Sequence, residues 1–193
     1  MADRNLSLRY ADHASVGRLI DLIVYAAEGI SLGFDQWSDP RMRGPGLYVI
    51  VVAGTSIAEF ADPMGKNRWP TDECVGLSDD SDAFFEAAET VAMENDGAVV
   101  VTVDGTICEQ MVRLKDVSAD ELAALGVSEG LEYADWMGAR HMSAVDTSAR
   151  EAVVAAITLS EESGRVTRFQ DGAYTSHKRE ELGGVWRGDD TER

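Results

Sequence analysis

The chain has 193 residues and a mass of 20.9 kDa, a length that suits one domain and leaves little room for two. Its 35 acidic residues outnumber 17 basic ones, and the formal net charge of −18 argues against bulk attraction to nucleic acid or to an anionic membrane. The hydrophobic share of 45% is ordinary for a packed core, so the composition favours a folded acidic domain over a disordered chain.

The N-terminal part contains one helical pattern and one long loop. Apolar residues recur at helical spacing from Val16 to Val24, with Ser15 as the expected N-cap and Gly29 as the expected end. The polar stretch Ser31 to Gly46 is interrupted by glycine and proline, which predicts a surface loop. We expect residues 1–46 to pack, as a leading helix and loop, on the same domain as the rest.

The middle of the chain alternates strand and helix. Leu47 to Ala53 is dense in apolar and β-branched residues and lies between two glycines, which predicts a buried central strand. Asp62 to Asp80 carries two prolines and two glycines and predicts an irregular region. Ser81 is the expected cap of a second helix, and this helix leads into a strong strand pattern from Val99 to Val103.

Turn signals organise the next segment. Asp104-Gly105 predicts a hairpin in which Ile107 to Leu114 returns antiparallel to the preceding strand. Ser118 to Glu121 has the spacing of a capping box and opens a short helix that we expect to end at Gly126.

The C-terminal part completes the pattern. A helix after Gly138 precedes two strands, Ala152 to Leu159 and Arg165 to Gln170. The predicted fold class is therefore α/β, a single domain with a central mixed β-sheet flanked by helices. We expect its core over residues 47–182 and a loose polar tail over 183–193.

Cysteine usage and targeting signals indicate the compartment. Cys74 and Cys108 form no CxxC pair, so they are interpreted as reduced residues of a cytosolic protein. The N-terminus lacks the features of a signal peptide, and no apolar stretch is long enough to cross a bilayer. We expect a cytoplasmic protein without membrane contact. Its acidity also suits a very salty cytoplasm, where screening removes most of the self-repulsion.

Three short segments place chemically useful residues at junctions. In Asp96-Gly97-Ala98, two small residues would let a ligand approach the backbone while the carboxylate holds a hydroxyl or a metal ion, but the residues alone favour a simple turn that joins helix to strand. In GARHMSA, residues 138–144, a helix start with Arg140 and His141 beside it suits a phosphate, or is only a helix start. SEESG, residues 160–164, is either an acidic turn or the edge of a pocket.

Together these segments resemble the motifs of the diadenylate cyclase (DisA-N/DAC domain) family. That family carries a DGA motif, a GTRHR-like motif and a downstream SEE-type turn in the same order, and this variant looks most like the archaeal branch. The resemblance covers roughly Leu47 to Gly172. It implies an enzyme that condenses two ATP molecules into cyclic di-AMP and two pyrophosphates, with Mn²⁺ or Mg²⁺ as cofactor. Self-association into at least a dimer would bring two ATP molecules face to face.

The resemblance also implies roles for individual residues. Asp96, Arg140 and His141 would be catalytic. Asp96 and Glu162 would bind the divalent cation, Asp96 would also position the ribose 3′-hydroxyl, and Arg140 and His141 would hold the triphosphate. The residues expected at the nucleotide are Asp96, Gly97, Ala98, Leu114 (against the adenine), Gly138, Ala139, Arg140, His141 and Ser160 (at a phosphate).

Two departures from the family pattern leave other functions open. Ala139 occupies the position of the family's usual threonine, and Met142 occupies the position of its second arginine. Arg113 or Lys115 is the candidate replacement for the missing positive charge. One alternative is a catalytically silent domain that binds ATP or a cyclic dinucleotide as a regulator. The other is a structural or interaction domain whose three motifs are turns. Because the chain is so acidic, binding of ATP requires that the negative electrostatic field of the protein be reversed locally. A divalent cation, Arg140, His141 and the helix N-terminus would reverse it.

Overall fold

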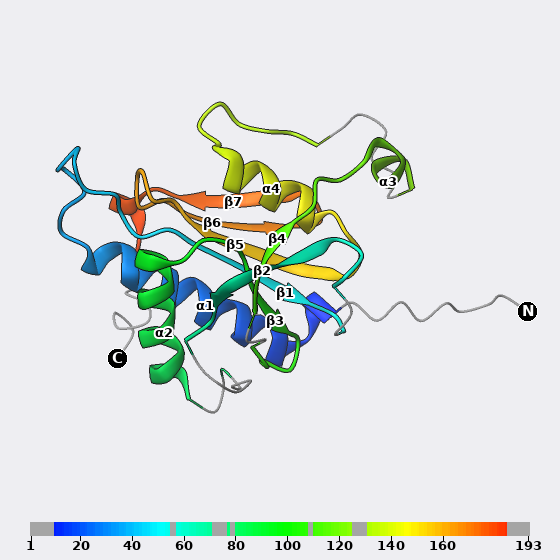
Figure 1. Cartoon of the computed structure of the whole chain (residues 1–193), viewed down its shortest axis with the longest axis horizontal. Helices are drawn as coiled ribbons and strands as arrows, with labels where there is room; N and C mark the ends of the chain where they lie inside the picture. The colour runs from blue at the N-terminus through cyan, green and yellow to red at the C-terminus, as the bar shows by residue number, and fades with distance from the viewer. Residues whose placement is uncertain are drawn as a thin grey trace, which may run out of the picture.

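The computed structural model describes residues 10–54, 57–70, 77, 80–107, 110–124 and 131–184. A five-stranded sheet in the order β3-β1-β5-β6-β7 forms the centre, and β2 and β4 form a separate two-stranded sheet (Figure 1). The elements are α1 (Ala14–Gly33), β1 (Leu47–Val52), β2 (Ala61–Arg68), α2 (Ser81–Glu94), β3 (Val99–Thr102), β4 (Gln110–Leu114), α3 (Ala119–Ala124), α4 (Ala139–Ser148), β5 (Val153–Leu159), β6 (Val166–Gln170) and β7 (Ala173–His177).

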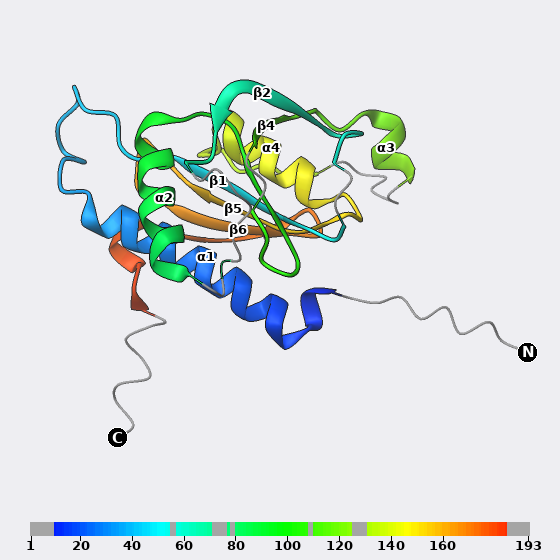
Figure 2. The same ribbon diagram turned by 60° about the horizontal axis from the view of Figure 1, so that its bottom comes forward.

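The central sheet is mixed and has a core on each face. β1 pairs parallel with β3 and antiparallel with β5, and β5, β6 and β7 continue antiparallel. Leu47, Val49 and Val51 pack with α1 and α2, whereas Tyr48 and Ile50 pack with α4 and the two-stranded sheet. Figure 2 shows these layers on either side of the sheet. The predicted α/β fold with a flanked mixed sheet is therefore confirmed, and the complete burial of β1 explains its apolar run.

The first helix is longer than the sequence predicts. α1 continues through Gly29 to Gly33, and its N-cap residue is His13, with Ser15 inside the helix. A Cβ atom at Gly29 would lie 2.9 Å from the ring of Phe85 on α2. This glycine therefore allows the two helices to approach closely, and does not end the helix.

The region predicted as irregular contains a strand. β2 pairs antiparallel with β4, and its register shifts between Pro63 and Arg68. A polar edge strand tolerates proline and glycine where a central strand does not, which is why the sequence pattern hid it. The predicted antiparallel return of Ile107 to Leu114 along the strand from Val99 is present: among the described residues, antiparallel bridges join Ala98 to Val112 and Val101 to Ile107, while β4 forms its ladder with β2.

Cap geometry refines two further predictions. The capping box is confirmed, because the Ser118 backbone N–H donates to Glu121 and the Glu121 N–H donates to the Ser118 hydroxyl. At α2 the N-cap is Asp80, one residue before Ser81, and its carboxylate accepts from the Ala83 N–H at 2.9 Å.

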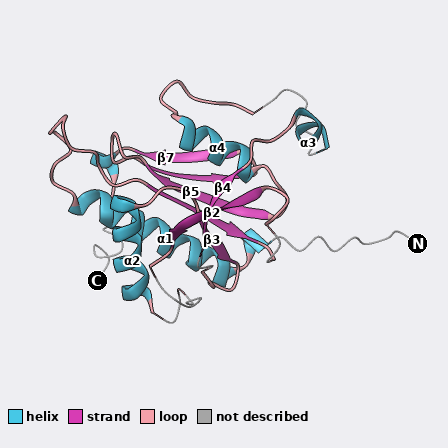
Figure 3. Cartoon of the chain, in the orientation of Figure 1, coloured by secondary structure: helices cyan, strands magenta, loops and turns pink. Residues whose placement is uncertain are grey.

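Helices lie on both sides of the strands in Figure 3.

Some predictions fall outside the described residues, namely those for Cys74, Cys108, the helix end at Gly126 and residues 185–193 of the tail. The first tail residue is attached to the domain, since the Gly183 N–H donates to the Glu28 carboxylate of α1 at 2.8 Å. Among the described helices, none has both the length and the apolar character needed to cross a membrane.

Candidate functional site

The sheet register brings the three motif segments to one edge of the domain. Leu47 at the start of β1 pairs with Leu159 at the end of β5, and Val49 pairs with Val99 at the start of β3. The DGA segment precedes β3 and the SEESG segment follows β5, so both lie at this edge. α4 packs on β5 and is joined to its start by a short turn, which returns the beginning of α4 to the same edge.

A cavity of about 490 Å³ opens where these segments meet. Its volume lies in the range of sites that bind one small ligand. Every residue that the sequence places at the nucleotide or the metal lines this cavity: Asp96, Gly97, Ala98, Leu114, Gly138, Ala139, Arg140, His141, Ser160 and Glu162.

The DGA segment forms a tight turn against β2 and β4. Gly97 has a φ of +103°, and a Cβ atom there would lie 2.6 Å from the Met64 sulfur. Its N–H donates to the Asp96 carboxylate at 2.9 Å, and Asn67 donates to the Asp96 carbonyl. The turn leaves the Asp96 side chain 82% exposed at the cavity, where it can reach a ligand.

The start of α4 presents unpaired donors beside an arginine. Gly138 is the N-cap and supplies no side chain to the free backbone N–H groups of the first turn. The Arg140 guanidinium is mostly buried, and lies 3.8 Å from an Asp96 oxygen and 3.5 Å from a Glu161 oxygen. Such an arrangement suits an anion, which would exchange with these carboxylates for the same guanidinium group.

His141 is buried and uncharged at neutral pH. Its ring lies 5.1 Å from Trp136 and 6.3 Å from Phe169, centre to centre, and only 6% of the residue is exposed. Burial, and then the charges of Arg140 and Arg165, lower its pKa to about 4. The expected positive charge at His141 is therefore absent near pH 7. Its buried Nε2 atom has no partner among the described residues, which leaves it free for a ligand.

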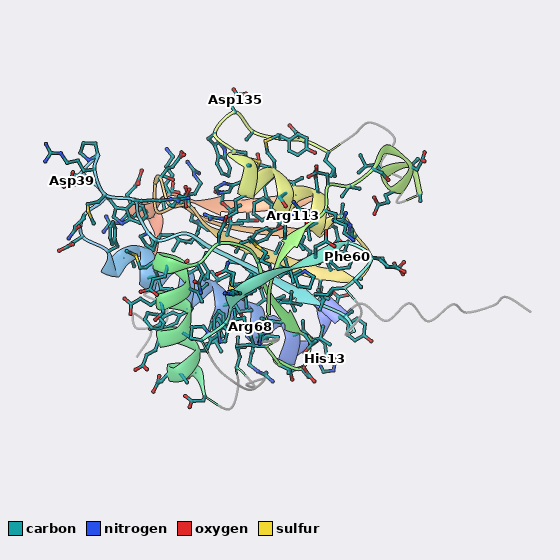
Figure 4. The ribbon with its side chains drawn as sticks, viewed as in Figure 1. His13, Asp39, Phe60, Arg68, Arg113 and Asp135 are labelled. Carbon is teal, nitrogen blue, oxygen red and sulfur yellow. The ribbon has the colours of Figure 1, made fainter. Side chains whose placement is uncertain are left out.

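The structure also shows where Met142 and the two candidate replacements for the missing arginine lie. Met142 is exposed on α4 and does not line the cavity. Of the two candidate replacements, Arg113 lines the cavity and lies 3.6 Å from Asp62, on β4 near the centre of Figure 4. Lys115 does not line it, since its ammonium group donates to the carbonyl groups of Ala58 and Glu59.

Several cavity residues escaped sequence reasoning. They are Tyr48, Met64, Val112, Trp136, Ser143 and Glu161. Tyr48 belongs to the buried strand β1 and packs on the face toward α4, and Met64 lies in the segment predicted as irregular. Neither position belongs to a sequence motif. Glu161 stood within the SEESG segment, but only its ion pairs distinguish it from Glu162.

The donor set fits a divalent cation that arrives with a ligand. Among the described residues, no group of three or more His, Cys, Asp or Glu side chains could hold a metal by itself. Asp96 and Glu162 both line the cavity and offer carboxylate oxygens. Mg²⁺ commonly binds through one or two carboxylates together with substrate phosphates, so two protein ligands are sufficient.

Comparisons with known proteins identify the fold. No family model matches the chain, and no curated protein sequence matches it. Among solved structures, DacA from Staphylococcus aureus, studied as a double cysteine mutant, has a TM-score of 0.50 and 17% identity over 88% of this chain and 93% of its own. A hypothetical membrane spanning protein from Bacillus cereus has a TM-score of 0.53 and 16% identity over 81% of this chain. The match spans 62% of that Bacillus protein. The chain thus has a fold like that of the diadenylate cyclase domain.

Proposed function

We propose that this protein is a diadenylate cyclase, which condenses two ATP molecules into cyclic di-AMP and two pyrophosphates. The observation that carries the proposal is the cavity of about 490 Å³, because all three motif segments line it although they are far apart in the sequence. The likeness to DacA supports the same conclusion at the level of the fold.

Each motif has a physical task in this reaction. Arg140 and the N–H groups at the start of α4 bind the triphosphate and offset the charge that develops on the α-phosphate and the leaving pyrophosphate. Asp96 accepts a hydrogen bond from the ribose 3′-hydroxyl and orients its oxygen for attack. Leu114 and Ala98 offer apolar surface for the adenine.

Asp96 and Glu162 would hold Mn²⁺ or Mg²⁺, which when bound polarises the phosphoryl oxygens and lowers the pKa of the attacking hydroxyl. His141 is neutral near pH 7 in the ligand-free protein, and its ring would supply a hydrogen bond to the bound phosphates. The local reversal of the acidic field then depends on arginine side chains, the helix N-terminus and the cation.

The chemistry requires two copies of the chain. In each half-reaction a 3′-oxygen bonds to the α-phosphorus of the other ATP and its proton passes to the adjacent Asp96 carboxylate, while the bond from the α-phosphorus to the bridging β-phosphate oxygen breaks and pyrophosphate leaves. The cavity has the size of a site for one nucleotide, so the second ATP must be held by a facing copy. Holding both nucleotides in line supplies most of the rate enhancement by proximity.

The alternative, a silent domain that binds ATP or a cyclic dinucleotide, draws support from the neutral His141 and from Ala139. Both reduce the contacts available to a reacting triphosphate. Such a domain would bind nucleotide without releasing pyrophosphate.

The test is incubation of the protein with ATP and Mn²⁺ or Mg²⁺, with detection of cyclic di-AMP and pyrophosphate. We expect both products, and a fall in specific activity on dilution because two copies are needed. Asp96→Asn should reduce turnover at least about a hundredfold. Asp135→Asn is the matched control, since Asp135 is an exposed carboxylate near the site that does not line the cavity (Figure 4).

ATP binding without product would favour the silent domain. The absence of both binding and product would reject nucleotide chemistry at this cavity, and full activity of Asp96→Asn would reject the assigned role of that carboxylate.

A further inference from the structure

The loop after α1, predicted only as a surface loop, packs against Arg140 and Glu161 of the candidate site. The Gly44 N–H donates to the Glu161 carbonyl at 3.1 Å, and the Gly46 N–H donates to the Ala92 carbonyl at 2.8 Å. A Cβ atom at Gly46 would lie 2.5 Å from a guanidinium nitrogen of Arg140. Bare backbone is thus packed directly against the arginine of the site.

This loop carries a second arginine to the same carboxylate. Nη2 of Arg43 lies 2.6 Å from Oε1 of Glu161, while Arg140 approaches the other oxygen, Oε2, at 3.5 Å. The pKa of Arg43 is raised, chiefly by the hydrogen bond to Glu161 and its charge, and Asp96 adds a smaller effect. The two guanidinium groups therefore face one carboxylate from two sides.

A smaller cavity of about 140 Å³ adjoins the main one at this point. Asp96, Arg140 and Glu161 line both cavities, and Arg43 lines only the smaller. The two cavities are therefore adjacent, and the ion pairs of these three residues lie between them. A chain of phosphates that displaces the carboxylates from the guanidinium groups would extend from the main cavity toward Arg43.

The local charge balance explains why a second arginine is needed. Asp96, Glu161 and Glu162 bring three carboxylates to the main cavity, and His141 is neutral. Arg140 alone cannot offset these groups together with a triphosphate. Arg113 also lines the main cavity, but its charge is partly offset by Asp62, which lies 3.6 Å away.

We propose that Arg43 binds the outer phosphates of the nucleotide together with Arg140, as a positioning cation supplied by the loop after α1. This inference rests on the proposed function. The Arg43 side chain is 75% exposed, so it can turn from Glu161 to a phosphate without unpacking the core. It provides a second guanidinium group beside Arg140 at the boundary of the two cavities.

The test compares nucleotides that differ only in phosphate number. Binding of AMP and of an ATP analogue with a methylene group between the α- and β-phosphates is measured by calorimetry with Mg²⁺. For Arg43→Ala we expect the affinity for the triphosphate to fall about tenfold to a hundredfold, the effect of losing a charged hydrogen bond, with the affinity for AMP unchanged. Arg43→Lys should recover part of the loss, because it keeps the charge without the planar fork.

Arg41→Ala is the matched control, since Arg41 is exposed in the same loop and lines neither cavity. Its affinities should equal those of the wild type. Equal binding of the triphosphate by Arg43→Ala and wild type would overturn the inference while the proposed function stands. The same holds if Arg43→Ala weakens AMP and triphosphate equally. A wild-type protein that binds neither nucleotide would overturn the proposed function, and this inference with it.

Discussion

His141 shows how burial changes the chemistry of a single residue. On an exposed helix start, a histidine beside an arginine would be partly charged near neutrality. Here the ring is packed against Trp136 and Phe169, and removal of water from the charged form is the main cause of its low pKa. The neutral ring can form a hydrogen bond with a ligand, but it exerts no long-range electrostatic attraction on an anionic ligand.

A stability measurement tests this state. The pKa of His141 is about 4 in the folded protein and 6.5 in an ordinary environment, so the unfolded chain binds more protons between these values. The stabilisation is complete above pH 6.5 and is lost as the pH falls toward 4, by about 3 kcal/mol. Urea unfolding of wild type and of His141→Gln at several pH values should show a smaller acid loss in the variant. Parallel pH profiles would contradict a buried neutral His141.

At the scale of elements, the helix that leads to the DGA turn depends on its first residue. α2 places Phe84 in the core and ends at Glu94, just before Asp96, so its position helps to fix the turn. Asp80 accepts from the Ala83 N–H and also lies at the positive end of the helix dipole.

The cap can be tested with two neighbouring substitutions. Asp80→Ala should lower the free energy of unfolding by about 1 kcal/mol, because one N–H of the first turn loses its acceptor. Ser81→Ala should change it by less than about 0.5 kcal/mol, since Ser81 already lies inside the helix. Denaturant midpoints give both values. A larger effect at Ser81 would show that the sequence pattern, and not the structure, placed the cap correctly.

At the scale of the whole molecule, the net charge of −18 opposes both compaction and the approach of a polyanion such as ATP. Arg43 and Arg140, with the open start of α4, are positive groups within this field, but three carboxylates lie beside them at the candidate site. Salt should therefore act on the fold through screening of the repulsion.

The melting temperature should rise between 0.1 M and 2 M KCl at pH 7. If screening relieves on the order of 2 kcal/mol, the rise is about 4–8 °C for a chain of this length. Calorimetry at pH 4.5, close to the sequence pI of about 4.4, is the control, because there the net charge is small and the salt effect should largely disappear. An unchanged melting temperature at pH 7 would contradict the expectation of a protein adapted to high salt.

The sequence by itself determined the elements whose local pattern agrees with their environment. The run from Leu47 is apolar on both sides and must be buried, and the spacing of Ser118 and Glu121 satisfies helix donors locally. The sequence did not predict β2, because a polar edge strand shows no strong hydrophobic periodicity. The predicted helix end at Gly29 was wrong, because this glycine is needed for close packing against Phe85, a residue distant in sequence. The three motifs were found because their residue types carry chemistry wherever the chain places them.

Only the tertiary structure decided what those motifs share and what surrounds them. The antiparallel pairing of β1 with β5 and its parallel pairing with β3 bring distant segments to one edge of the sheet. Burial then removed the charge from His141, and close backbone packing at Gly46 brought Arg43 to Glu161. Pairing register, desolvation and long-range contact depend on groups that are remote in sequence, so no local pattern could have supplied them.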